Sequence, residues 1–465
     1  MPPRWLAVVI FFGTLVLIGV AQLYWYRRAR SLVGRARPGW PRWALGLLLF
    51  SPLCLVWFVY VAGTGALLLS FFTNPGAPRG LIVFLHTLRH SVVMIPVGLW
   101  SAASGFSFLF IKLVEATGWL AARVYARGAS RRAGRPATPN PVNPDRRYFL
   151  QTATSLAGAV PFAVVGYGFF RRQRYTVEAV SVPILNLPPA LDGLRLVQLT
   201  DVHASAYMPV SEIDRVVAMA SELDADLVFH TGDFITSRGD PLDTAIDTLA
   251  RVRGRYGLFG CLGNHEIYAV AETRATRRFT RHGCKILRGE AQVIEIRGAR
   301  LNLIGVDYQR QPRGPARKRG AGRDPSRALG ASPEDYRDYF LRGIEPLVRR
   351  DMPNILLTHN PNPFRRAAEL GIELTLAGHT HGGQVQVEIL DSRLSPARFI
   401  TRFISGLYSL PSGQAALAAE AVSTGHRPRV TGHCFLYVSR GIGTIGMPVR
   451  LGAPPEITLL TLSRA

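Results

Sequence analysis

Carboxylate, imidazole and carboxamide side chains recur in five short blocks of this sequence, each placed directly after an apolar run. The blocks read LTDVH, HTGD, LGNHE, LLTHN and AGHTHGG. The candidate metal ligands in them are Asp201, His203, Asp233, Asn264, His359, His379 and His381. Oxygen and nitrogen ligands without a thiolate suit divalent Mn, Fe, Zn or Mg ions. The blocks therefore predict a site for divalent metal ions.

The apolar runs before these blocks are short and β-rich, and amphipathic stretches separate them. Strands are predicted over residues 194–199, 226–230, 257–262, 301–306, 354–357 and 373–376, and helices over 210–223, 242–253 and around 333–350. Such alternation is typical of βαβ units with a sheet covered on both faces. Ligands of an open α/β sheet bind beyond the carboxyl ends of its strands, so the blocks are predicted to meet at one rim.

Two neighbouring cations need a carboxylate between them, and Asp233 is the natural bridge because the other ligands fall on either side of it in the sequence. Taken alone, an aspartate such as Asp201 after a strand is more often a helix cap or a turn residue. Because five such blocks are predicted to meet at one rim, metal binding is the better interpretation here. His230 lies inside a predicted strand, where a core histidine is the more common case.

The order of the blocks resembles that of the calcineurin-like metallophosphoesterases, over about Asp192 to Leu462. Together with the tail motifs VSRGIG and MPVRLGAPPE, it resembles the bacterial membrane-anchored branch, which is related to exported phosphodiesterases and UDP-2,3-diacylglucosamine hydrolase-type enzymes. The resemblance implies an α/β fold, a two-sheet sandwich flanked by helices. Residues 308–331 and 412–433 depart from the family pattern as insertions, which leaves the substrate open.

The same resemblance implies the roles of the site residues. Asp201, His203, Asp233 and His381 would hold one ion, and Asp233, Asn264, His359 and His379 would hold the other. His265 would be catalytic, protonating the leaving oxygen or stabilising charge in the transition state. The implied reaction is hydrolysis of a phosphodiester or pyrophosphate by a hydroxide that bridges two metal ions.

Charge is distributed very unevenly along the 465 residues, which carry a net charge of +24. Residues 1–175 hold 20 Lys and Arg against only Glu115 and Asp145. A nucleic-acid binder would spread basic charge over a folded face with aromatic residues or a recognition helix beside it. Here the charge lies beside apolar runs, so no nucleic-acid partner is predicted. The four cysteines show no paired spacing, which excludes a disulfide framework.

Long apolar runs predict a bundle of about four transmembrane helices, with spans near 5–26, 43–72, 91–111 and 152–170. Arg-rich loops over 27–42 and 123–147 separate them, so residues 1–175 form a membrane region and 176–465 the metallophosphoesterase domain. The positive-inside rule places both loops in the cytoplasm, and the fourth span then carries the catalytic domain across. The junction Arg146-Arg147-Tyr-Phe-Leu resembles a twin-arginine signal. Arg171, Arg172 and Arg174 argue for the opposite side.

These features predict a membrane-anchored, metal-dependent phosphoesterase in the bacterial cytoplasmic membrane, with its catalytic domain extracytoplasmic. The anchor favours a lipid-linked or envelope substrate, while a soluble nucleotide and a cell-wall phosphodiester stay open. The alternative is a membrane sensor or scaffold that uses the phosphoesterase fold only to bind a phosphorylated ligand. Loss of a metal ligand or of His265 would favour that alternative, and none is missing from the sequence.

Overall fold

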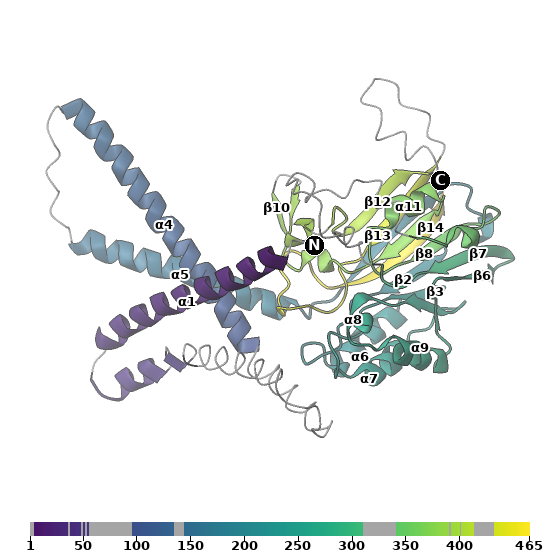
Figure 1. Ribbon diagram of the computed structural model, residues 1–465, viewed down its shortest axis with the longest axis horizontal. Helices are drawn as coiled ribbons and strands as arrows, with labels where there is room; N and C mark the ends of the chain where they lie inside the picture. The colour runs from purple at the N-terminus through teal and green to yellow at the C-terminus, as the bar shows by residue number, and fades with distance from the viewer. Residues whose placement is uncertain are drawn as a thin grey trace, which may run out of the picture. The chain divides into compact units, whose positions relative to one another are not determined.

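The computed structural model describes residues 4–35, 38–47, 50–51, 54, 95–133, 144–309, 341–389, 392–399, 401–412 and 432–465. The chain divides into two units, Met1–Phe169 and Phe170–Ala465 (Figure 1). The described part of the first unit contains the long helices α1 (Arg4–Arg35), α4 (Ile95–Ala133) and α5 (Pro144–Arg171). The last two residues of α5 belong to the second unit. The second unit holds every block of candidate metal ligands.

Polar contacts join the three helices of the first unit. The amide of Gln22 on α1 donates to the hydroxyl of Ser104 on α4 over 2.8 Å and accepts from the indole N–H of Trp100 over 3.0 Å. The hydroxyl of Ser107 donates to the carbonyl of Gly158 on α5. A Cβ at Gly158 would lie 2.7 Å from the side chain of Ile111, so the two backbones approach closely there. Small residues and interhelical hydrogen bonds of this kind are typical of helices packed in a membrane.

Within the described part of the chain, one helical segment, Val97–Val124 in α4, is long and apolar enough to cross a membrane. It overlaps the span predicted over 91–111, and the four-span bundle stays a prediction. Most of the span predicted over 43–72 lies outside the described residues. The structure differs from the prediction at the Arg-rich loops, because α1 continues through Arg27, Arg28 and Arg30 and α4 continues to Ala133. Arginine is a good helix former, so charge alone does not end a helix.

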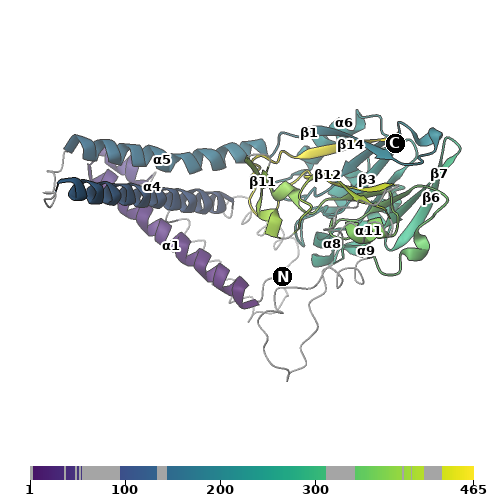
Figure 2. The same cartoon turned by 90° about the horizontal axis from the view of Figure 1, so that it is seen from above.

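Two six-stranded mixed sheets form the second unit. The first has the order β1-β14-β2-β3-β4-β5 and the second β12-β13-β9-β8-β7-β6, with β6 and β7 as an edge hairpin (Figure 2). The strands of the first sheet are β1 (Thr176–Ile184), β2 (Arg195–Leu199), β3 (Leu227–Thr231), β4 (Leu258–Cys261), β5 (Lys285–Ile286) and β14 (Glu456–Arg464). Those of the second are β6 (Glu290–Ile296), β7 (Ala299–Gly305), β8 (Asn354–Leu357), β9 (Leu374–Ala377), β12 (Gly406–Pro411) and β13 (His433–Val438). A separate ribbon pairs β10 (Val387–Ile389) with β11 (Ser392–Leu394).

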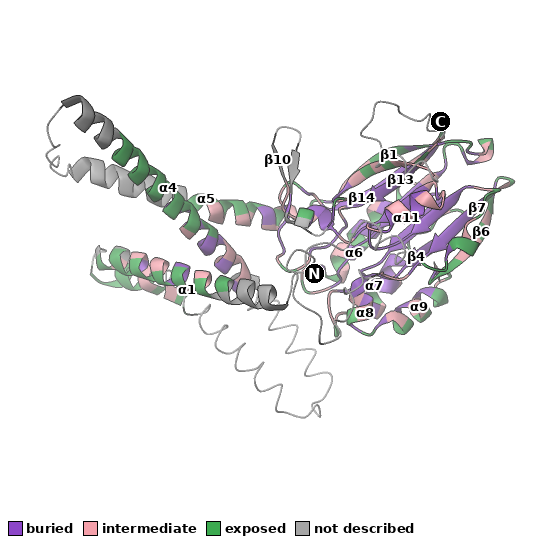
Figure 3. Cartoon of the chain, turned by 45° about the horizontal axis from the view of Figure 1, so that its top comes forward, coloured by how far each residue is buried: buried purple, intermediate pink, exposed green. Residues whose placement is uncertain are grey.

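Apolar side chains fill three layers around the sheets. One core lies between the two sheets, where Leu196 and Phe229 of the first sheet pack in the same cluster as Leu357 and Leu376 of the second. A second core packs the outer face of the first sheet against its helices, α6 (Val210–Ser221), α7 (Leu242–Leu249) and α9 (Glu272–Arg281). On the second sheet, α11 (Phe364–Glu369) covers the outer face. The inner strands β2, β3, β4, β8 and β9 are therefore buried on both faces, as near-continuous apolar runs predict, whereas the edge strands β1, β6 and β12 keep exposed residues (Figure 3).

The architecture confirms the predicted two-sheet α/β fold with flanking helices. Strand β8 occupies the predicted residues 354–357, and β2, β3, β4, β7 and β9 begin or end within two residues of their predicted bounds. The helix predicted around Pro333 to Arg350 is different. Its described part, 341–350, contains only the 3₁₀ turn Glu345–Leu347, where Pro346 removes a backbone donor and restricts the residue before it.

Candidate metal centre

Parallel strands from both sheets end at the same place, and the candidate ligands follow them. Asp201 and His203 follow β2, Asp233 follows β3, and Asn264 and His265 begin the short helix α8 (Asn264–Tyr268) after β4. From the second sheet, His359 follows β8, and His379 and His381 follow β9. The structure thus brings together side chains that lie up to 180 residues apart in the sequence. The ionisable members form three overlapping groups that could each hold a metal ion, Asp201/His203/His381, His203/Asp233/His265 and Asp233/His359/His379.

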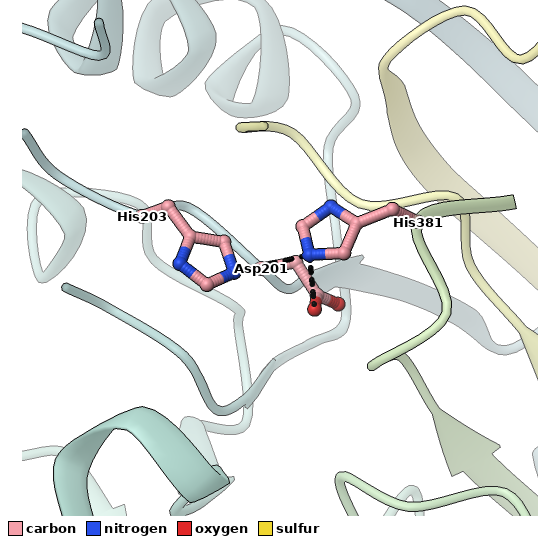
Figure 4. A group of neighbouring side chains, drawn as sticks. All are labelled: Asp201, His203 and His381. Atoms are coloured by element: carbon pink, nitrogen blue, oxygen red, sulfur yellow. Dashed lines mark hydrogen bonds and ion pairs between the residues drawn. The ribbon is translucent and has the colours of Figure 1, made fainter. Parts of the chain in front are cut away.

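The first group lies between the ends of β2 and β9. The Nε2 atom of His381 is 3.0 Å from Nε2 of His203 and 3.3 Å from Oδ1 of Asp201 (Figure 4). All three side chains are buried. Asp201 is fixed in turn by the hydroxyl of Thr200, which donates to Oδ2 over 2.9 Å, and by the backbone N–H of His379. Two imidazole nitrogens and a carboxylate oxygen thus converge on one point.

Asp233 lies between the two sides of the site. Its Oδ2 atom is 3.0 Å from Nε2 of His359, 3.6 Å from Nε2 of His203 and 4.0 Å from Nε2 of His265. Its Oδ1 atom accepts the backbone N–H of His265 over 2.9 Å. A Cβ on Gly263 would lie 2.1 Å from this oxygen, so only glycine leaves room for the carboxylate. One oxygen of Asp233 therefore faces ligands of both groups.

The third group, Asp233/His359/His379, lies at the ends of β3, β8 and β9. Nε2 of His359 is 3.2 Å from Nδ1 of His379, and Nδ1 of His359 donates to the carbonyl of Thr231 over 2.7 Å. That hydrogen bond fixes the ring and leaves Nε2 facing Asp233, the arrangement that orients a histidine for a metal. Asn264 is buried, and its Oδ1 atom has no hydrogen-bond partner in the described structure.

Five of these residues have an unusual backbone. Asp201, His203, Asp233, His379 and His381 have φ values of 54°, 50°, 56°, 74° and 53°. This left-handed region is uncommon for residues other than glycine and costs about 1–3 kcal/mol at each position. Such strain concentrates where a site needs a side chain aimed in one direction. The sequence gives no signal for it, because aspartate and histidine are found in many ordinary loops.

Glu266 ties two of the ligand loops together. Its buried carboxylate accepts the backbone N–H groups of Asp233, Phe234 and Gly263 over 3.0, 2.8 and 2.9 Å. Burial raises the pKa of Glu266 to about 7, with a further rise from the charge of Asp233. Glu266 completes the LGNHE block, and the structure places it as the link between the loops after β3 and β4.

Burial and mutual proximity shift the pKa values of His203, His379 and Asp233 in the direction that metal binding needs, and those of His359 and Asp201 in the opposite direction. Burial lowers the pKa of His203 and of His379 to about 3, which favours neutral imidazole. Burial alone would raise the pKa of Asp233, but the neighbouring His359 and His203 hold it well below its usual range. For His359, burial opposes charge, yet Asp233 and Asp201 raise its pKa to about 10. A cation can replace that proton, because metal binding releases protons from its ligands.

The donor set fits divalent metal ions. Neutral imidazole nitrogens only 3.0 Å apart, as in His203 and His381, repel unless a proton or a cation lies between them. The unpartnered carboxamide oxygen of Asn264 is a further acceptor without a donor. Buried polar atoms normally have partners, so these two observations point to a cation as the missing one. Manganese, iron, zinc and magnesium all suit this set of oxygen and nitrogen donors.

His265 is half-buried, like His379, and differs from the ligands in its partners. Its side chain is 11% exposed. The Nδ1 atom contacts the carbonyl of Thr236 over 2.5 Å, which leaves Nε2 facing Asp233. The ring packs edge-on against His203, with centroids 4.7 Å apart.

Other histidines lie away from the cluster. His230 is buried in the outer core of the first sheet, where its ring packs against Phe234 and Phe279. His282 pairs with Asp247 over 2.7 Å. The ring of Tyr308 lies 5.3 Å from that of His379, a neighbour that no motif indicated. The predicted insertions over 308–331 and 412–433 fall largely outside the described residues.

The family model for calcineurin-like phosphoesterases matches residues 194–383, the stretch that contains all five blocks. The chain carries a calcineurin-like metallophosphoesterase domain. "Transmembrane protein with metallophosphoesterase domain" of Danio rerio is 28% identical over 471 residues, which cover 98% of this chain and 89% of that protein. "Phosphodiesterase YaeI" of Escherichia coli K12 is 24% identical over 331 residues, 68% of this chain and 98% of that protein.

Among solved structures, the purple acid phosphatase PPD1 from yellow lupin matches with a TM-score of 0.30 and 14% identity, over 55% of this chain and 45% of that one. The family assignment of the metallophosphoesterase domain and the His and Asp clusters together support a metal-dependent phosphoesterase.

Proposed function

We propose that this protein is a membrane-anchored phosphoesterase that binds two divalent ions and hydrolyses a phosphodiester or pyrophosphate bond. The observation that carries the proposal is the position of Asp233, whose Oδ2 lies 3.0 Å from Nε2 of His359 and 3.6 Å from Nε2 of His203, members of two different ligand groups. A carboxylate in that position is suited to lie between two cations. The name of its relative YaeI supports a diester as the substrate class.

Each group of residues has a defined part in this proposal. Asp201, His203 and His381 would hold one ion together with Asp233, and Asn264, His359 and His379 would hold the other, also with Asp233. Two divalent ions, when bound, supply positive charge to the phosphate oxygens and lower the pKa of a water molecule for in-line attack. His265, with Nδ1 occupied by Thr236, presents Nε2 to the leaving oxygen and can give it a proton.

The membrane anchor supports a lipid-linked or envelope substrate, because it keeps the active site within reach of headgroups. The test uses the full chain in detergent micelles, stripped of metal and then titrated with Mn²⁺. Hydrolysis of bis(p-nitrophenyl) phosphate is expected to be lost on chelation and to return as about two equivalents of metal bind. Phospholipids and lipid pyrophosphates presented in mixed micelles are expected to be better substrates than soluble diesters.

Two results would contradict this function. Tight binding of a phosphorylated ligand without turnover at any metal concentration would support the sensor or scaffold instead. Faster turnover of soluble nucleotides than of every lipid substrate would support the enzymatic activity but exclude a lipid-linked substrate. The p-nitrophenyl phosphate monoester serves as the control for diester preference.

We also propose that the catalytic domain faces away from the cytoplasm. The arginines of residues 27–42 and 123–147 support this orientation through the positive-inside rule, and Arg171 to Arg174 oppose it. A periplasmic reporter such as alkaline phosphatase, fused after Ala465, is expected to be active, and the domain should be accessible to protease in spheroplasts. Activity of a cytoplasmic reporter alone at the same position would place the domain at the inner leaflet.

A further inference from the structure

Arg450 is the largest fully buried side chain among the described residues. It lies near the C-terminus, between β13 and β14, far in sequence from every candidate ligand. Its two terminal nitrogens donate to five backbone carbonyls within the described structure. These acceptors are the carbonyls of His381 at 3.0 Å, Arg440 at 2.8 Å, Ala453 at 3.3 Å, Gly441 at 3.1 Å and Gly443. A buried cation held by five carbonyls has a positional role, because burying it without partners costs free energy.

One of the five carbonyls belongs to His381, a candidate metal ligand. Three others belong to the 440–443 segment, which contacts a second candidate ligand, Asp201. Gly443 donates its N–H to the carbonyl of Asp201 over 2.7 Å, and Ile442 donates to the carbonyl of Thr200 over 3.1 Å. Gly441 has φ +68°, and a Cβ there would lie 2.6 Å from the Cβ of Asp201. The 440–443 segment is therefore pressed against the backbone of Asp201.

We propose that Arg450 is a positioning residue that sets the spacing of His381 and Asp201 for one of the two ions. The proposal rests on the proposed metal-dependent function. A single guanidinium joins the loop after β9, through the His381 carbonyl, to the loop after β13, which holds the end of β2. His381 and Asp201 come from different sheets, and their 3.3 Å contact depends on those loops staying in register.

The geometry of the side chain explains why arginine is needed. A guanidinium offers N–H donors in a rigid planar fork and can reach several carbonyls at once, whereas lysine has one compact ammonium group. Replacing one by the other at a site with several acceptors is not conservative. Among its described hydrogen bonds, Arg450 has none to His359 or Asn264. Removal of the guanidinium should therefore weaken the binding of one ion and leave the affinity for the other unchanged.

The test measures Mn²⁺ binding to the full chain by equilibrium dialysis and elemental analysis, independently of activity. The variants are Arg450→Lys and Arg450→Gln, so that the second can replace the first if lysine prevents folding. We expect one ion to bind with wild-type affinity and the other to bind about 10- to 100-fold more weakly. Activity should return when the Mn²⁺ concentration is raised by the same factor.

The matched control is Asn302→Ala, which removes a buried side chain of β7 that bonds Leu347 and Asn354. This variant should lose thermal stability and keep both affinities. Wild-type affinity for both ions in the Arg450 variants would overturn the proposal. So would an equal weakening of both ions, or a selective loss that Asn302→Ala reproduces at the same thermal stability. Failure of the wild-type protein to bind two ions would instead refute the proposed function.

Discussion

Asp233→Asn is expected to abolish most of the activity and to lower the metal content at the same time. The Oδ2 atom of Asp233 is the oxygen within 4.0 Å of Nε2 in His203, His265 and His359. Asparagine has nearly the same shape, so the fold should persist, but it has no charge and replaces one acceptor with a donor. We expect metal content to fall below one equivalent and turnover to fall by about a thousandfold.

The measurement combines elemental analysis of the purified variant with rates at saturating Mn²⁺. Asp214→Asn is a suitable control, because Asp214 is half-exposed and forms a surface ion pair with Arg251. That variant should keep both metal and rate, since exposed ion pairs contribute little. Two full equivalents of tightly bound metal in Asp233→Asn would exclude Asp233 as the bridge between the ions.

The sequence indicated the strands of the site and the side chains after them because both signals are local. An apolar run such as 354–357 predicts a strand, and the parallel pairing of β8 with β9 then places His359 beside His379. Three other features could not be predicted this way. They are the left-handed backbone of the ligands, the backbone N–H groups that donate to Glu266, and the carbonyls that accept from Arg450. Each depends on segments that meet only in the folded chain.

The helices of the first unit show a second limit of local patterns. Hydropathy reports the length of an apolar run, and the helices of the structure are longer than those runs. Helix α1 extends to Arg35, beyond the span predicted over 5–26, and α4 extends to Ala133, beyond 91–111. Nor does hydropathy indicate which helices touch. The hydrogen bond from Ser107 to Gly158 depends on α4 and α5 meeting in the folded chain.

His265→Ala is expected to keep both ions and to lower turnover by about 100- to 10,000-fold. The contact that His265 makes with Oδ1 of Asp233 comes from its backbone N–H, which alanine retains. The substitution therefore removes the imidazole without releasing the carboxylate. His282→Ala is the matched control, because His282 lies in the outer layer and pairs with Asp247. Its rate and metal content should equal those of the wild-type protein.

The size of the loss should depend on the leaving group if His265 donates a proton. A p-nitrophenolate leaves as an anion with little need of a proton, whereas an alkoxide needs one in the transition state. We therefore expect His265→Ala to slow an alkyl phosphodiester far more than bis(p-nitrophenyl) phosphate. The same loss with both substrates would assign the imidazole to charge stabilisation on the phosphoryl group. An alanine variant with wild-type turnover on both would remove His265 from the reaction, and Nε2 would then face Asp233 for a structural reason only.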